Sequence, residues 1–216
     1  MAESHTARTD VTSEAVIYAV AYVEVMPPSI AEATALLKQY RQASRMDAGL
    51  VRLEVLQQRH RPDHFAIVET WQDQKAFEAH GREAHTRALH ERLQPLRTSP
   101  YDERLHQAFS LGSAPASGSA GAIYTLTHAD AIPPAKDDAM AALKQLAEAS
   151  RCEAGGLDFE VLQQRSRLNH FTIVELWRDQ RSLEAHTMAA HTRRFRELFQ
   201  PMSGSLYDER LYQALD

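Results

Sequence analysis

The sequence predicts an α+β protein of two tandem ferredoxin-like β-α-β-β-α-β repeats that close into one two-lobed α+β barrel. Three observations support this prediction. The chain matches itself without gaps after a shift of 106 residues, and a segment rich in Ser, Gly and Ala separates the two copies. Within each copy, stretches with the two-residue period of a strand and stretches with the period of a helix follow one another in the order of that unit.

The duplication covers almost the whole chain. Identical residues occupy 47 of the 94 positions that align 16–109 with 122–215. Two copies are too few for a solenoid, so we interpret the chain as a fused homodimer whose two bare sheet faces pack together. The predicted organisation is a polar tail at 1–13, repeat 1 at 14–109, a Gly/Ser/Ala linker at 110–121 and repeat 2 at 122–216.

Composition and charge exclude several classes of protein. Hydrophobic residues make up 44% and charged residues 25% of the 216 residues, as in ordinary globular domains. No apolar run reaches the roughly 20 residues of a membrane span, and no signal peptide is predicted. A formal charge of -5 argues against a nucleic-acid surface, and a lone cysteine fits a reducing compartment. We therefore expect a cytoplasmic protein that binds a small molecule and neither nucleic acid nor membrane, with further homo-oligomerisation left open.

The first half of each repeat reads as a strand and a helix. Residues 15–25 of repeat 1 are rich in Val, Ile, Tyr and Ala, which favours a strand. A Pro-Pro pair ends this strand and starts a helix over 31–46. Apolar positions recur along it at helical spacing, at Ile30, Ala33, Leu37 and Tyr40. Gly49, which is Gly155 in the second copy, is expected to adopt the left-handed conformation that stops the helix.

The second half reads as two strands, a helix and a last strand. Residues 50–59 alternate in polarity, with the apolar Val51, Leu53 and Val55 on one face and Arg52 and Glu54 on the other. A short polar turn follows, and 64–71 form the next strand. Asp73 stands where a helix N-cap belongs. The helix is predicted over 75–96, with a break near Gly81, and 102–109 form the final strand.

One constellation carries candidate chemistry. On the strand at 64–71, Glu69 and Trp71 are two residues apart and therefore share a face. On the next helix, Phe77, His80 and Ala84 form a stripe that should pack towards this strand. The sequence therefore predicts that His80 lies near Glu69 and Trp71. The second copy repeats the three residues as Glu175, Trp177 and His186.

The strand with Glu-x-Trp, followed by a helix that ends in Ala-His, resembles the antibiotic biosynthesis monooxygenase superfamily, and the resemblance covers nearly all of both repeats. It implies the dimeric α+β barrel fold. Members include quinol and anthrone monooxygenases, which use O2 without a metal or flavin. Other branches isomerise small molecules, degrade haem or have no known activity. The haem-degrading members carry an axial histidine on the helix after the Trp-bearing strand. The matching residue is His90 in repeat 1 but Arg196 in repeat 2, so haem breakdown is not expected here.

The resemblance implies a cofactor-independent monooxygenase that oxidises a quinol, an anthrone or a similar phenol with O2. Such an enzyme needs a dry pocket, a base and a donor for the oxyanion. Histidine is the natural base at neutral pH, and a carboxylate could orient it or hold a substrate hydroxyl. The catalytic candidates are His80, His186, Glu69 and Glu175, and the candidates for contact with an aromatic substrate are Trp71, Trp177, Phe77, Tyr18 and Tyr124.

Each of these residues also has a purely structural interpretation. The tryptophans and histidines could pack in the core, and the glutamates could make structural hydrogen bonds. The chain could then be a non-oxidative binding protein or an isomerase of the same fold. No metal site is predicted, because His80 and His85 would lie about 140° apart on a continuous helix. For the same reason, His85 and its copy His191 are expected at the surface or behind the site.

Overall fold

The structure, a computed structural model, describes residues 16–112 and 121–215. The predicted tail at 1–13 and the central part of the predicted linker, 113–120, lie outside the described residues. Both repeats have the predicted order of elements. In repeat 1 these are β1 (Ile17–Glu24), α1 (Ile30–Ser44), β2 (Leu50–Gln58), β3 (His64–Trp71), α2 (Gln74–Gly81), α3 (Ala84–Leu93) and β4 (Asp102–Ser110). In repeat 2 they are β5 (Ile123–Asp130), α4 (Lys136–Ser150), β6 (Gly156–Gln164), β7 (His170–Trp177), α5 (Gln180–Met188), α6 (Ala190–Phe199) and β8 (Asp208–Ala214).

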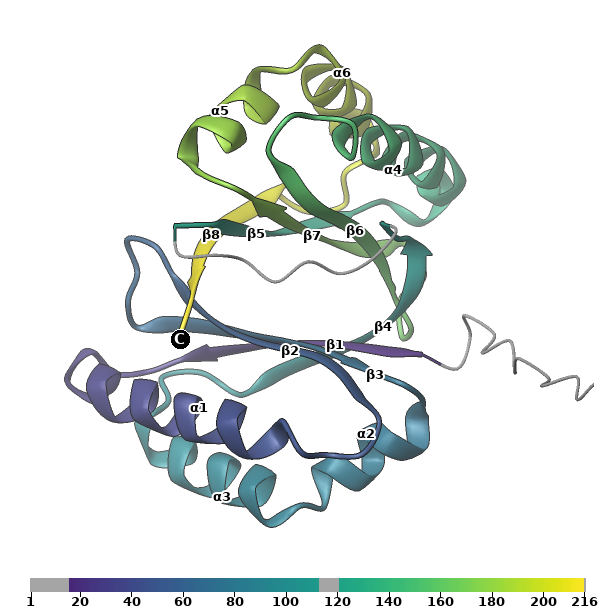
Figure 1. Cartoon of the computed structure of the whole chain (residues 1–216). Coiled ribbons are helices and arrows are strands. Elements are labelled where there is room, and N and C mark those ends of the chain that lie inside the picture. Colours follow the sequence, from purple (N-terminus) through teal and green to yellow (C-terminus); the bar gives the residue numbers. More distant parts are fainter. Residues whose placement is uncertain (1–15, 113–120, 216) are drawn as a thin grey trace, which may run out of the picture.

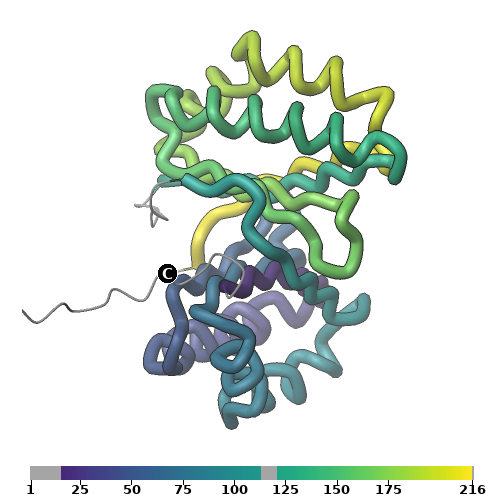
Figure 2. The backbone as a smooth tube through the Cα atoms, turned by 90° about the vertical axis from the view of Figure 1, so that its right-hand side faces the viewer, coloured from purple at the N-terminus to yellow at the C-terminus, as the bar shows by residue number. Residues whose placement is uncertain are grey.

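The eight strands form one closed barrel in the order β1-β3-β2-β8-β5-β7-β6-β4. Within each repeat, the first strand lies between the third and the fourth. The pairs β2–β8 and β4–β6 join the two repeats, so the edges that one repeat leaves open are paired by the other. The helices of repeat 1 and those of repeat 2 cover opposite outer sides of the barrel (Figures 1 and 2). The prediction of two ferredoxin-like repeats in one intramolecular barrel is confirmed.

Each sheet has two buried faces, which explains why its strands are apolar on both sides. In β3, Phe65 and Ile67 belong to the core beneath the helices, whereas Ala66 and Val68 belong to the core inside the barrel. This alternation is the two-residue period of a strand. Glu69 and Trp71 follow the register of Phe65 and Ile67. The candidate site therefore lies between the sheet and its helices.

Two backbone features depart from a regular pattern. Gly49 and Gly155 have φ of +83° and +96°, so the predicted left-handed conformation is confirmed, in the turn that enters β2 or β6. A Cβ at position 49 would lie 2.5 Å from the Cβ of Ala76, which adds a steric reason for glycine. Val51, expected on a buried face, is 58% exposed, because the register of β2 against β3 shifts between Leu50 and Arg52.

The barrel interior contains a buried ion cluster that links the repeats. Arg52 of β2 donates to Asp158 over 3.0 Å and to Glu160 over 2.6 Å, and all three side chains are less than 10% exposed. Because β2 and β6 are not neighbours in the barrel, these contacts cross its interior. Burial and the neighbouring Glu160 raise the pKa of Asp158 to about 6. Arg52 and Asp158 occupy the same position of the two repeats, so this contact is a point where the two copies have become complementary.

Candidate active site

The strand and helix that flank the candidate site bring its residues together. The indole Nε1 of Trp71 donates to Glu69 Oε2 over 2.9 Å, and the rings of Trp71 and His80 lie 4.5 Å apart between centroids. Glu69 is 4% exposed, His80 4% and Trp71 0%. The predicted proximity of these three side chains is confirmed. The Asp73 side chain caps α2 by accepting from Ala76 N over 2.8 Å, which fixes where that helix begins.

A tyrosine from α1 completes the hydrogen-bond network of repeat 1. The hydroxyl of Tyr40 donates to Glu69 Oε1, and it also lies 2.7 Å from His80 Nε2. The direct distance from His80 Nε2 to Glu69 Oε1 is 3.9 Å. Tyr40 therefore connects the imidazole to the carboxylate. The sequence predicted Tyr40 only as an apolar position of the first helix.

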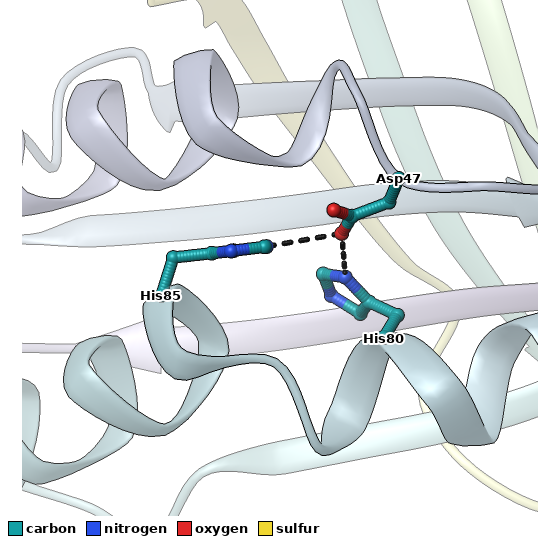
Figure 3. Close-up of side chains that lie close together, drawn as sticks. All are labelled: Asp47, His80 and His85. Carbon is teal, nitrogen blue, oxygen red and sulfur yellow. Dashed lines mark hydrogen bonds and ion pairs between the residues drawn. The ribbon is translucent and has the colours of Figure 1, made fainter.

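Asp47, which follows α1, holds the other side of the imidazole. Its Oδ2 lies 2.6 Å from His80 Nδ1 and 3.0 Å from His85 Nε2, so both rings converge on one oxygen (Figure 3). The predicted separation of the two histidines is wrong. The helix breaks after Gly81, and α3 starts again in a new direction at Ala84, which is exposed instead of buried. His85 is 22% exposed at its side chain and thus connects the buried network to solvent.

Repeat 2 keeps most of these contacts and lacks one. Trp177 donates to Glu175 over 2.7 Å, and Glu153 stands in the position of Asp47, 2.6 Å from His186 Nδ1 and 2.8 Å from His191 Nε2. The residue in the position of Tyr40 is Leu146, which is 3% exposed and has no hydroxyl. His186 Nε2 and Glu175 Oε2 are 3.8 Å apart, beyond hydrogen-bond distance.

Burial shifts the proton affinities of this region. It raises the pKa of Glu175 to about 7, with a smaller contribution from Glu209, although the hydrogen bond from Trp177 opposes the shift. Burial also lowers the pKa of His186, in spite of the Glu153 carboxylate. In repeat 1, burial and the Glu69 charge raise the pKa of Glu103 to about 7. Carboxyl groups with a pKa near neutrality are suited to proton transfer at neutral pH.

Two of the predicted substrate contacts, Tyr18 and Tyr124, lie away from the candidate site. Tyr18 and Tyr124 belong to the core inside the barrel, on the face of the sheet opposite Glu69 and Glu175. Burial raises the pKa of Tyr18 to about 12. Phe77 is partly buried on α2. The structure therefore groups the glutamates, tryptophans and histidines, and separates the two tyrosines from them.

A cavity of about 410 Å³ opens in repeat 2 between the end of α6 and the loop before β8. Its lining includes Arg196, Phe199, Leu206 and Tyr207. Tyr207 packs against the core cluster that contains Trp177. Burial and, to a smaller extent, the Glu175 carboxylate raise the pKa of Tyr207. The cavity therefore ends at a side chain that packs on the core around the candidate site. Repeat 1 has Arg97 in the position of Ser203, another residue of the cavity lining.

Among the described residues, two clusters have side chains that could ligate a metal ion. In each, two imidazole nitrogens and one carboxylate oxygen lie within 4.8 Å of one another: Asp47, His80 and His85 in repeat 1, and Glu153, His186 and His191 in repeat 2. Two histidines and a carboxylate are a known ligand set for Fe(II). Here, however, the distance of 2.6 Å from imidazole to carboxylate is that of a hydrogen bond. The prediction that no metal binds stays untested, although the helical spacing argument behind it is wrong.

Comparison with known proteins identifies the family. The sequence profile named antibiotic biosynthesis monooxygenase matches residues 16–92 and again 123–198, which together are well over half of the chain. The chain therefore belongs to the antibiotic biosynthesis monooxygenase family and carries two tandem domains of it. This membership supports an activity of the monooxygenase type. No functionally curated protein matches the sequence.

Solved structures confirm that the tandem fold recurs. A protein of Fusobacterium nucleatum, provisionally named a monooxygenase, superposes with a TM-score of 0.84 at 16% identity, over 94% of this chain and 93% of the other. One from Lactobacillus acidophilus, with the same provisional name, gives 0.76 at 12% identity over 94% and 95%. An anthrone oxidase-like protein gives 0.68 at 14% identity over 94% and 92%. At these identities, the likeness concerns the fold.

In the described residues, no helix has the length and apolar character needed to cross a membrane.

Proposed function

We propose that this protein is a cofactor-independent monooxygenase that uses O2 to oxidise a quinol, an anthrone or a similar phenolic small molecule in the cytoplasm. The observation that carries the proposal is the acid–base cluster beneath the helices of each repeat. A buried carboxylate, Glu69 or Glu175, accepts the indole N–H of a tryptophan and has an imidazole within 4 Å. Two protonatable groups so close together can exchange a proton with a substrate hydroxyl or an acidic C–H group.

The chemistry requires little from the protein beyond this set. The base removes a proton from the substrate, and the carbanion or phenolate gives one electron to O2. The resulting radical and superoxide combine at a ring carbon that still carries a hydrogen, which gives a peroxide anion. Protonation of this anion gives the hydroperoxide, and loss of water then leaves a carbonyl, so that one oxygen atom enters the product and the other leaves as water. The site must exclude bulk water and return the proton at the right step.

We assign the role of base to Glu69 and Glu175, with His80 and His186 behind them as the groups that exchange protons with solvent. Trp71 and Trp177 hold the carboxylates through their N–H groups and offer ring faces to an aromatic substrate. In repeat 1, the proposed entry for such a substrate is a cavity of about 450 Å³ whose lining includes Tyr101 and Arg104. In repeat 2, the proposed entry is the cavity that ends at Tyr207, the counterpart of Tyr101. Its lining combines apolar rings with Arg196, which suits a flat molecule with a phenolate oxygen.

An oxygen electrode tests the proposal directly. The full chain should consume O2 with at least one member of a panel of hydroquinones and anthrones. The double variant Glu69→Gln/Glu175→Gln should lower the rate by about 10²–10⁴-fold, which is the usual contribution of a general base. Glu184→Gln, a change on the exposed side of α5, is the control and should leave the rate unchanged. Equal rates in the double variant and the control would contradict the assignment of the glutamates.

The alternative is a non-oxidative binding protein or isomerase of the same fold. The observation that favours it is the burial of the cluster, since Trp71, Glu69 and His80 are each at most 4% exposed. If the clusters serve only the core, no member of the panel will support O2 consumption. A bound phenol would then shift the melting temperature without being oxidised.

A further inference from the structure

The hydrogen bonds of repeat 1 form a continuous chain from a buried carboxylate to a side chain at the surface. The chain runs from Glu69 to Tyr40, His80, Asp47 and finally His85. The links from Tyr40 to His85 measure 2.6–3.0 Å, which is within hydrogen-bond range. Exposure rises along the chain: the side chain of His80 is 3% exposed, that of Asp47 12% and that of His85 22%.

The donors and acceptors along this hydrogen-bonded path allow it to carry a proton. An ionised carboxylate only accepts, so the nitrogen of His80 that faces Asp47 must donate. If Tyr40 donates to an ionised Glu69, then its oxygen accepts from the other nitrogen of His80, and the ring is an imidazolium. If Glu69 holds a proton instead, it donates to Tyr40, Tyr40 donates to His80, and the ring is neutral. The two states differ by one proton moved from His80 to Glu69, with the phenol as the link.

We propose that Tyr40 completes a proton relay that makes repeat 1 the copy able to exchange a substrate proton with solvent through Glu69, His80 and His85. In this relay, Glu69 takes the proton from the substrate. Tyr40 passes a proton to His80 as it receives one from Glu69, and His80 releases a proton past Asp47 and His85 to water. This inference rests on the proposed function, because it assumes that Glu69 is the group that meets the substrate.

The second copy supplies the natural comparison. Repeat 2 has the same carboxylate, indole and imidazoles, but Leu146 replaces the phenol and leaves 3.8 Å between His186 Nε2 and Glu175 Oε2. A proton on Glu175 therefore has no hydrogen-bonded path to His186 through this position. Two ionisable neighbours of Glu69, Tyr101 and Glu103, have counterparts in Tyr207 and Glu209, whereas a third, His90, is replaced by Arg196. The hydrogen bonds that join Glu69 to His80 both run through the Tyr40 hydroxyl. The absence of a phenol at Leu146 thus accounts for the break between imidazole and carboxylate in repeat 2.

The relay can be tested in the full chain without a substrate. Tyr40→Phe keeps the ring and removes only the hydroxyl, and its matched control is Leu146→Phe in repeat 2. Nitrogen-15 NMR of the histidine rings should show that Tyr40→Phe changes the shifts of both ring nitrogens of His80 and leaves those of His186 unchanged. Unchanged His80 shifts in a variant that melts at the wild-type temperature would overturn the relay.

Turnover gives the second readout. With a substrate that wild-type enzyme oxidises, Tyr40→Phe should lower the rate of O2 consumption at least about tenfold and change the solvent deuterium isotope effect, whereas Leu146→Phe should do neither. Adding Leu146→Tyr to Tyr40→Phe should recover part of the rate, because it rebuilds the link in repeat 2. If wild type is active and Tyr40→Phe keeps its rate within twofold, the relay is wrong and the proposed function stands. If wild type oxidises nothing, the proposed function fails and the NMR result alone decides whether the hydrogen-bonded chain exists.

Discussion

Replacing Glu175 by glutamine should remove a pH dependence from the stability of the protein. Burial raises the pKa of Glu175 in the folded state to about 7, above the value of 4.5 expected in the unfolded chain. Between these two values the unfolded chain has released the proton and the folded protein still holds it. Folding is therefore favoured at low pH, and this contribution is lost as the pH rises through the folded pKa.

The size of the effect follows from the two pKa values. A group with this shift makes the folded protein about 2.5 kcal/mol less stable at pH 8.5 than at pH 5. Glutamine does not ionise and still accepts the hydrogen bond from Trp177. Wild type and Glu175→Gln are unfolded in urea across this pH range, and the free energy of unfolding is plotted against pH. The free energy of unfolding of the variant should rise relative to that of wild type as the pH rises.

The difference between the two proteins isolates Glu175, because every other titrating group is common to both. Glu184→Gln on the exposed surface is the control and should follow wild type at each pH. Parallel curves for wild type and Glu175→Gln, with a difference that varies by less than about 0.5 kcal/mol, would refute the reasoning. The carboxyl group would then ionise normally in the folded protein and would not be suited to act as a base near neutral pH.

Three further predictions concern the buried ion cluster, the turn at Gly49 and the pairing of the two repeats. Arg52→Met leaves two buried carboxylates without their cation and should lower the free energy of unfolding at pH 8 by about 3–5 kcal/mol, measured in urea; a loss below 1 kcal/mol would contradict the ion cluster. Gly49→Ala should lower the free energy of unfolding by about 2 kcal/mol or more, because of the positive φ of Gly49 and the close Cβ of Ala76. The control Gly81→Ala, with no atom within 4 Å of the added Cβ, should leave the free energy of unfolding unchanged or raise it. Equal melting temperatures for the two variants would contradict this prediction. Segments 1–112 and 120–216, expressed apart, should be unstable or associate in sedimentation experiments, and a stable soluble monomer of either would contradict the fused-dimer account.

Most of the fold was predictable because it depends on local patterns and on the repeat. The shared face of Glu69 and Trp71 in β3, the cap at Asp73 and the glycine at position 49 each depend on a few neighbouring residues, and the structure agrees with all three. The cross-repeat pairs β2–β8 and β4–β6 are contacts between distant segments, and only the duplication indicated that such pairing would exist. The exposure of Val51 depends on a shift of register at the start of β2, directly after Gly49. In the sequence this glycine indicated only the end of the helix, and the alternation of 50–59 gave no sign of the shift.

The site was predictable only in part. The spacing of Glu69, Trp71 and His80 was enough to bring them together, since it involves one strand and the helix that follows. Tyr40 and Asp47 come from α1 and the turn after it, and no periodic pattern relates that helix to the later one. The signal that could have found Asp47 is the acid that replaces it at Glu153 in the second copy. The convergence of His85 depended on how sharply the helix breaks after Gly81, which the sequence does not specify.

The central claim, that this chain inserts one oxygen atom of O2 into a phenolic or anthrone substrate, is tested most directly by isotope labelling. An anthrone that supports O2 consumption is incubated with the full chain under oxygen gas enriched in the heavy isotope of oxygen. The quinone product is extracted, and its mass is measured by mass spectrometry. We expect one labelled atom in the new carbonyl group, formed at a rate that is lower in the Glu69→Gln/Glu175→Gln variant. A product whose new oxygen comes from water, or labelling at the same rate in that double variant, would contradict it.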